Sequence, residues 1–133
     1  MLAIKQRRLL PHARGDMLEL SHHHTSSSET SWKRLLWYVL AGARGGPNRG
    51  RIINLLRAEP YNINRLAKAL NVHYRVAEHH IRSLEKNRLV VSQGEKYGRL
   101  YFLSPEMEAN LHIFDDIWRQ IQPKTRKDIE KQQ

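Results

Sequence analysis

The stretch that most constrains the fold of this chain is NINRLAKALNVHYRVAEHHIRSLEKNRLVV, residues 62–91. Its apolar side chains recur three and four residues apart in two runs, which predicts two short amphipathic helices. The runs consist of Ile63, Leu66, Ala67 and Leu70, and then of Ala77, Ile81 and Leu84. Asn62 occupies the position of an N-cap acceptor for the first helix. Residues 71–73 leave room only for a sharp turn, so the stretch predicts a helix-turn-helix unit.

The second helix of this unit carries a polar face opposite its apolar row. A helix-turn-helix unit places its second helix in the major groove of DNA, where such a face meets base edges and phosphates. The residues on this face are Tyr74, Arg75, Glu78, His79 and Arg82. We expect Arg75, His79 and Arg82 to contact bases or phosphates. Glu78 either accepts a hydrogen bond from cytosine or discourages wrong sequences, and Tyr74 either contacts a phosphate or only closes the turn.

The positive charge of the chain is concentrated on the segment that holds this unit. The net charge is +10, and residues 31–103 carry 14 Lys and Arg against 4 Asp and Glu. Residues 104–122 carry 1 against 4. Such an asymmetry is typical of a protein that binds a polyanion. A solvated basic surface would give the same counts, so charge alone does not decide between the two.

Composition excludes several kinds of chemistry. Without cysteine, the chain has no disulfide, no thiolate metal sensor and no cysteine nucleophile. No apolar run approaches the length of a membrane span, and no apolar segment follows the first basic residues as in a secretory signal. We therefore expect a cytoplasmic protein. Its 133 residues predict one domain, residues 31–122, between a flexible N-terminal segment, residues 1–30, and a charged C-terminal tail, residues 123–133.

The eight histidines do not indicate a metal site. His22, His23 and His24 are consecutive, so they cannot easily turn toward one ion, and no further ligand is spaced to help them. A flexible polar linker explains them better. His79 and His80 are adjacent on a helix and point about 100° apart. Because His80 lies nearer the apolar row, we expect a hydrogen-bonded structural histidine there and no DNA contact.

The segment SWKRLLWYVLA, residues 31–41, predicts a helix that Ser31 can cap. Its large apolar side chains cover a wide face, which a single small domain has difficulty burying. Two explanations compete: the helix packs on its own core, or it packs on a second copy of the chain. We favour the second copy, with the C-terminal helix in the same contact. The side chains expected in this dimer contact are Trp32, Leu36, Trp37, Val39 and Leu40.

A C-terminal helix is predicted from Ser104-Pro105-Glu106, which combines a capping hydroxyl, a proline at the first position and an acid in the first turn. Apolar residues follow at spacings of four and three, and the other side of the helix is acidic, which disfavours contact with DNA. We therefore expect this helix to serve packing or dimerisation. The apolar stripe consists of Met107, Leu111, Phe114, Trp118 and Ile121.

The glycine-rich segment GARGGPNRG, residues 42–50, predicts a loop that leads into a helix, with Pro47 in its first turn. Nucleotide binding is unsupported, because a P-loop requires Lys and then Ser or Thr after its last glycine, and Arg51-Ile52 follows here. The amino end of a helix favours anions, so the arginines near it are candidates for a phosphate contact. They are Arg44, Arg49 and Arg51.

A β-hairpin is predicted directly after the helix-turn-helix unit. Its strands are residues 89–93 and 99–103, joined by a glycine-bounded tip, residues 94–98. A hairpin at this position is a wing, and Lys96 and Arg99 near its tip would meet the DNA backbone or the minor groove. An ordinary surface hairpin is the alternative, which the position directly after the second helix disfavours.

The order of these elements resembles a winged helix-turn-helix domain, and the sequence is similar to an archaeal group of ArsR/MarR-like regulators. Members of that group look like GGPTR-x-x-I-x-x-L-L, PYN-x-x-x-LA-x-x-L, Y-x-x-V-x-HH-L-x-x-L and YG-x-x-Y-F-L-S. This chain has GGPNRGRIINLL, PYNINRLAKAL, YRVAEHHIRSLEKNRLV and YGRLYFLSPE in the same order, over about residues 45–106. It departs from the pattern at Val76-Ala77, where the group has a small polar residue and then Val, and at Arg88, where a glycine commonly precedes the wing strand.

The resemblance implies a mainly α fold with a small β-hairpin, a winged helix-turn-helix domain with extra N- and C-terminal dimerisation helices. It also implies a homodimeric transcriptional regulator whose partners are double-stranded DNA and a second copy of the chain. Arsenic-type metal sensing is not carried over, because its cysteines are missing. No cofactor is indicated.

Other functions remain compatible with the sequence. Winged helices also serve as protein-interaction modules, in which case the aromatic helix and the Trp118 stripe would be the working surface. RNA binding is a second alternative. An enzyme is disfavoured, because no paired carboxylates, no nucleophile with its base and no metal-ligand spacing stand out from their structural explanations.

Overall fold

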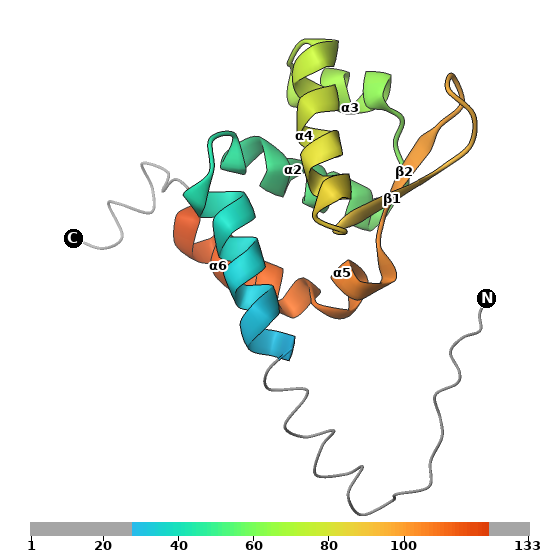
Figure 1. The fold of residues 1–133 in the computed structure, drawn as a ribbon. Coiled ribbons are helices and arrows are strands. Elements are labelled where there is room, and N and C mark those ends of the chain that lie inside the picture. The colour runs from blue at the N-terminus through green and yellow to red at the C-terminus, as the bar shows by residue number, and fades with distance from the viewer. Residues whose placement is uncertain (1–27, 123–133) are drawn as a thin grey trace, which may run out of the picture. The chain divides into compact units, whose positions relative to one another are not determined.

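The computed structural model describes residues 28–122 (Figure 1). The chain divides into two units, residues 1–32 and 33–133. The described part of the first unit, residues 28–32, is helical, so Ser31 lies within a helix and does not cap one as expected. The expectations for the N-terminal segment up to residue 27, including His22, His23 and His24, and for the tail, residues 123–133, lie outside the described residues.

The second unit is mainly helical and has one small β-hairpin, which confirms the predicted fold class. Residues 33–37 are helical and lead into the π-helix η2 (Tyr38–Gly42). Three helices follow in the order expected for a helix-turn-helix domain, then the hairpin and two C-terminal helices (Figure 1). These elements are α2 (Gly46–Ala58), α3 (Ile63–Leu70), α4 (Tyr74–Lys86), β1 (Val90–Gln93), β2 (Leu100–Leu103), α5 (Pro105–Ala109) and α6 (Leu111–Ile121).

The ends of α3 and the start of α4 are determined by three residues. Asn62 caps α3, because its side-chain oxygen accepts a hydrogen bond from Arg65 N at 2.8 Å, as the sequence predicts. Asn71 ends α3 in the left-handed region, with φ 58°. His73 then caps α4, because its Nδ1 accepts a hydrogen bond from Arg75 N at 3.1 Å. The two helices can therefore change direction within three residues.

The core lies between α2, α3, α4 and the base of the hairpin. The apolar row of α4 is completely buried, with Ala77, Ile81 and Leu84 at 0% exposure. Helix α4 packs against α2, α3 and β1, and the buried residues of this region include Ile52 and Ile53 of α2, Leu66 of α3 and Leu89 just before β1. Because these side chains are buried, they determine which side of α4 remains outside. The fully buried members of this set are Ile52, Ile53, Leu66, Ala77, Ile81, Leu84 and Leu89.

The hairpin is attached to the helices at its base. Strand β1 pairs with β2 in antiparallel register, with Val90 opposite Leu103. Tyr61, just before α3, forms a further bridge with Tyr101 of β2, in which Tyr101 N donates to Tyr61 O at 2.8 Å. Ser92 Oγ donates to Glu85 Oε2 of α4 at 3.1 Å. The hairpin therefore has a defined position beside α4.

The C-terminal segment begins as predicted and then differs. Ser104 Oγ accepts a hydrogen bond from Met107 N at 3.0 Å, and Pro105 occupies the first turn. The single helix expected from the apolar stripe is interrupted at Asn110, which adopts φ −116° and ψ 19°. The Asn110 side chain donates to Glu106 O at 2.8 Å, so it ends α5 before α6 begins. An asparagine competes with the helical backbone in this way because its side chain can bond to a nearby carbonyl.

The packing of α2 on η2 gives a first test. A Cβ atom added at Gly46 would lie 1.8 Å from the carbonyl oxygen of Leu40, which is backbone and cannot move aside easily. We predict that Gly46→Ala lowers the free energy of unfolding by about 1–3 kcal/mol, although alanine normally favours a helix. Gly98→Ala is the control, because nothing lies within 4 Å of a Cβ there. Thermal unfolding followed by circular dichroism measures both, and equal stability of Gly46→Ala and wild type would contradict this packing.

Candidate nucleic-acid interface

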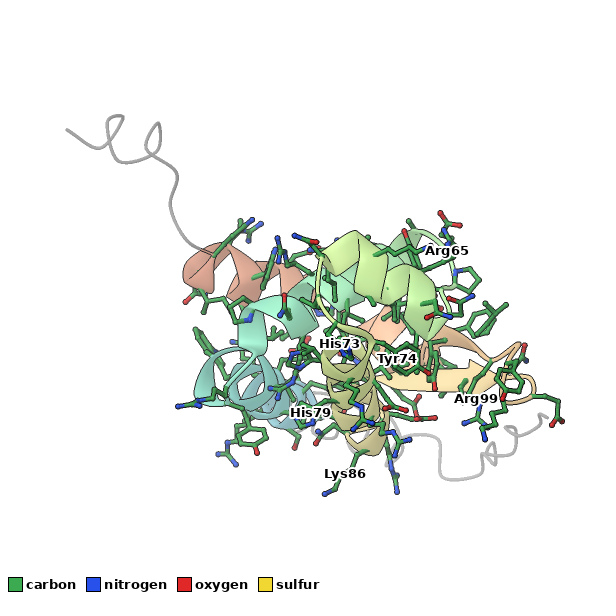
Figure 2. All side chains as sticks on the ribbon, turned by 90° about the horizontal axis from the view of Figure 1, so that it is seen from above. Arg65, His73, Tyr74, His79, Lys86 and Arg99 are labelled. Carbon is green, nitrogen blue, oxygen red and sulfur yellow. The ribbon has the colours of Figure 1, made fainter. Side chains whose placement is uncertain are left out.

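The outward face of α4 is exposed and carries cations. Arg75, His79 and Lys86 are all exposed, and Tyr74 is 42% exposed. Figure 2 shows Tyr74 on the side of α4 toward the hairpin and His79 on the side away from it. Within residues 28–122, the side chains of Arg75 and Lys86 form no ion pair and no hydrogen bond. This face is therefore open to solvent, and its cations can meet an external anion.

One arginine on this helix is paired with an acid. Arg82 Nη2 lies 3.1 Å from Glu78 Oε2, one helical turn away. The side chain of Arg82 is still 73% exposed, whereas that of Glu78 is 31% exposed. Arg82 thus faces both solvent and an acid.

A groove of about 470 Å³ separates α4 from the hairpin. It brings together the residues that the sequence assigns to the second helix and to the wing. Tyr97 at the hairpin tip is 93% exposed, and Lys96 Nζ lies 6.0 Å from the centre of its ring. Burial raises the pKa of the Tyr101 phenol at the base of the groove, and a hydrogen bond with the Arg99 side chain opposes this shift. The lining residues are Asn62, Ile63, Asn64, Tyr74, Glu78, Arg82, Glu85, Lys96, Tyr97, Arg99 and Tyr101.

Two residues of this surface, Asn64 and Lys86, are not among the predicted DNA-binding residues. The amino end of α3, with Asn64, forms one wall of the groove. Lys86 lies on the same outward face as Arg75 and His79, because the spacing of four and seven residues returns to one side of a helix. The spacing could have identified Lys86 from the sequence. The position of Asn64 depends on the angle between α3 and the hairpin, which the sequence does not show.

The expectation for Arg49 is wrong. Arg49 is only 6% exposed, and its Nη1 donates to the carbonyl oxygen of Val39 at 2.9 Å. It therefore connects α2 to η2 and cannot reach a phosphate from this position. Arg44 and Arg51 are exposed near the amino end of α2, and Arg51 Nη1 donates to Asn48 Oδ1 at 3.2 Å. Only these two of the three candidate arginines remain accessible.

His80 is buried as expected, at 6% exposure, but the expected hydrogen bond is not observed at Nδ1. Among the described residues Nδ1 has no hydrogen-bond partner. The ring packs on Gly45, where a Cβ atom would lie 2.3 Å from Cε1 of His80. Gly45 has φ 84°, a second reason why a larger residue is excluded. The pKa of His80 is lowered by burial first and then by the positive charges of Arg49 and His79.

Five residues assigned to a dimer contact are buried in the core of this chain. Their exposure is 2% or less, so a second copy cannot reach them, and the first explanation, packing on the chain's own core, applies. The prediction of an intermolecular role is wrong for them because an apolar row looks the same in either setting. They are Leu36, Val39, Leu40, Met107 and Phe114.

The remaining residues of this group are more accessible. Trp37 is 37% exposed, and it lines a hollow of about 400 Å³ with Lys33 and with Asp116, Ile117, Arg119 and Gln120 of α6. Trp118 is half-buried, because it stacks on Phe114 with ring centroids 5.8 Å apart and covers Gly50. Leu111 and Ile121 are half-buried. Trp32, also half-buried, belongs to the first unit.

Two further observations concern the described residues. Among residues 28–122, no three His, Cys, Asp or Glu side chains are grouped as ligands for a metal ion. None of the helices in this part of the chain is long and apolar enough to span a membrane.

The environment of His80 predicts a loss of stability on acidification. Its pKa lies below the ordinary value of 6.5 in the folded protein, so the unfolded chain binds a proton at a higher pH than the folded one. The free energy of unfolding should therefore fall as the pH drops through 6.5 toward the lower pKa of the folded state. His80→Leu should reduce this fall, whereas His79→Gln should keep most of it, because burial and Arg49, the two larger causes, still lower the pKa of His80. Melting temperatures measured as a function of pH across the acidic range test this prediction. Identical pH dependence of the melting temperature in His80→Leu and wild type would contradict the explanation.

Comparisons with known proteins identify the fold. No family model and no curated protein matches the sequence. The transcriptional regulator HlyU from Vibrio vulnificus CMCP6 matches with TM-score 0.54 and 19% identity, over 75% of this chain and 98% of that chain. The transcriptional regulator BldR from Sulfolobus solfataricus matches with TM-score 0.53 and 14% identity, over 91% of this chain and 94% of that chain.

A third structure, a "possible transcriptional regulator for arsenical resistance", is 30% identical over 54% of this chain and 76% of that chain. Its TM-score of 0.46 is too low to support a shared fold, so the assignment rests on HlyU and BldR. At 19% and 14% identity those two similarities concern the backbone alone. Together with the observed order of α2, α3, α4 and the hairpin, they show that this chain has the winged helix-turn-helix fold found in transcriptional regulators.

Proposed function

We propose that this chain is a transcriptional regulator that binds a specific sequence of double-stranded DNA as a homodimer. The observation that carries the proposal is the exposed cationic face of α4, with Arg75, His79 and Lys86 open to solvent beside the cationic hairpin. A helix of this kind, supported from behind by its apolar row, fits into the major groove. The regulators with the same fold support the role, and the basic charge of residues 31–103 agrees with it.

The groove between α4 and the hairpin separates the helix proposed for the major groove from the cationic side chains of the wing. With α4 in the major groove, Lys96 and Arg99 on the hairpin stand across from it, next to the phosphates or the minor groove. None of the acidic residues of α5 and α6 lines this groove. The proposed contacts therefore involve one side of the second unit only.

The proposed dimer uses the exposed part of the N-terminal helix and η2. Trp37 and Tyr38 are 37% and 60% exposed, and Trp37 is adjacent to α6. Large aromatic side chains that remain accessible are frequent anchors of protein contacts. A dimer would present two copies of α4 to half-sites about one helical turn apart, roughly 34–36 Å in the general case.

Arg75 provides the first test of DNA binding. We predict that the wild-type chain binds duplex DNA in a gel-shift titration and that its affinity falls steeply with salt, because bound phosphates release counterions. Arg75→Ala should weaken binding roughly tenfold. If Arg75 contacts a phosphate, the variant should also reduce the slope of log K against log salt by about 1.

The control for Arg75→Ala is Arg57→Ala, which removes the same charge from an exposed position on α2, outside α4, the hairpin and the proposed dimer surface. It should bind with nearly wild-type affinity. Salt-insensitive binding, or equal losses in both variants, would contradict the proposed interface. Stronger competition by single-stranded RNA than by duplex DNA would favour an RNA-binding module instead.

The dimer has its own test. Trp37→Glu places a charge on the exposed aromatic surface, so we predict that it shifts the protein from dimer to monomer in sedimentation velocity experiments, with association at least roughly tenfold weaker. Tyr97→Glu is the matched control, because Tyr97 is a 93% exposed aromatic residue on the hairpin tip, away from this surface. A wild-type chain that stays monomeric at every concentration, or a dimer that Trp37→Glu leaves intact, would exclude this contact.

A further inference from the structure

We propose that Glu78 and Arg82 of α4 together read one C·G base pair in the major groove, an inference that rests on the proposed function. Arg82 Nη2 lies 3.1 Å from Glu78 Oε2, so the two side chains form one unit on the surface of α4. Both line the groove between α4 and the hairpin. This unit therefore belongs to the part of α4 that faces DNA in the proposed complex.

In the described structure, the side chain of Glu78 has no contact that would explain its presence by stability. Among residues 28–122 its side chain bonds only to Arg82, and an exposed pair of this kind contributes little to stability. Glu85, the other acid of α4, connects the helix to β1, because its Oε2 accepts a hydrogen bond from Ser92 Oγ at 3.1 Å. A carboxylate close to phosphates weakens binding to every DNA sequence. Discrimination between sequences is the function that accounts for an acid in this position.

The free atoms of the pair match the groups that a C·G base pair presents in the major groove. Glu78 Oε1 can accept a hydrogen bond from cytosine N4, since the bond to Arg82 uses Oε2. Arg82 Nη1 and the second hydrogen of Nη2 can donate to O6 and N7 of guanine. Cytosine N4 and guanine O6 are neighbours in the base pair, as the carboxylate and the guanidinium are in the protein.

The contact between the two side chains also orients the arginine before DNA arrives. A free arginine side chain loses rotamer freedom when it binds a base, and an arginine already held by Glu78 loses less. The planar guanidinium then presents its fork of donors in a fixed direction.

Other base pairs present the wrong groups to this unit. When T·A replaces C·G, the acceptor O4 of thymine faces the carboxylate, and the donor N6 of adenine faces the guanidinium. An acceptor then faces an acceptor and a donor faces a donor, so these groups lose their hydrogen-bond partners. The expected preference for C·G at this position is roughly tenfold or more, about 1.4 kcal/mol for each factor of ten.

The experiment compares Glu78→Ala with Glu108→Ala, which removes the same charge from an exposed position on α5, outside the groove. Binding sites are first selected from a random duplex library with wild-type protein. Dissociation constants are then measured for the selected site, for the site with its C·G pair changed to T·A, and for random duplex. Wild type and Glu108→Ala should retain the preference for C·G. Glu78→Ala should reduce it to about twofold or less and should bind random duplex at least as tightly as wild type.

A third variant separates charge from geometry. Arg82→Lys keeps the positive charge without the planar fork, so it should lose the preference for guanine while its salt dependence stays close to that of wild type. Circular dichroism and thermal unfolding verify that all variants are folded. Selected sites without a C·G pair at the affected position, or an unchanged preference in Glu78→Ala, would overturn this inference and leave the DNA-binding function intact. If the wild-type chain selects no sequence at all, the proposed function fails as well.

Discussion

Burial of one side of α4 is the constraint on which the rest of the structure depends. Ala77, Ile81 and Leu84 have no exposed surface, because they pack against the neighbouring helices. Burying a large side chain such as Ile81 or Leu84 contributes about 1.5–3 kcal/mol, more than an exposed polar contact on the opposite side supplies. The apolar row therefore decides which way the helix faces, and its cations point outward as a consequence. The left-handed conformation of Asn71 ends α3 and the cap formed by His73 begins α4, so these two residues determine the turn between the helices.

A second set of contacts holds the hairpin beside α4 without covering the helix. The backbone bridge between Tyr61 and Tyr101 and the hydrogen bond from Ser92 to Glu85 both lie near the base of the hairpin. The tip is left free, as the 93% exposure of Tyr97 shows. The width of the groove is thus determined by contacts within the chain. A ligand that fits this groove has less conformational entropy to overcome than one that must first position a mobile hairpin.

The features that the sequence predicts correctly are those set by local interactions. The caps at Asn62 and Ser104 act within three residues, so the residue types and their spacing suffice to find them. Arg49 is different, because its burial depends on the carbonyl of Val39 in a π-helix that no apolar period indicates. Leu36 is a further case, since an apolar row has the same spacing whether it faces its own core or a second copy. Such assignments depend on which residues the side chain packs against in the folded protein, and the periodicity of the sequence does not identify those residues.

The charged side chains of the basic segment differ in how they are held, and this difference separates their roles in the proposed complex. Arg75 and Lys86 have no partner among residues 28–122, so they can follow phosphates and would supply affinity without information about sequence. Arg82 is oriented by Glu78, and an oriented guanidinium distinguishes bases better than a mobile one. Arg49 is bound to a backbone carbonyl inside the domain, so its charge supports the fold. A net charge of +10 is therefore a poor measure of DNA binding by itself, because a buried cation such as Arg49 adds to the charge without being able to reach DNA.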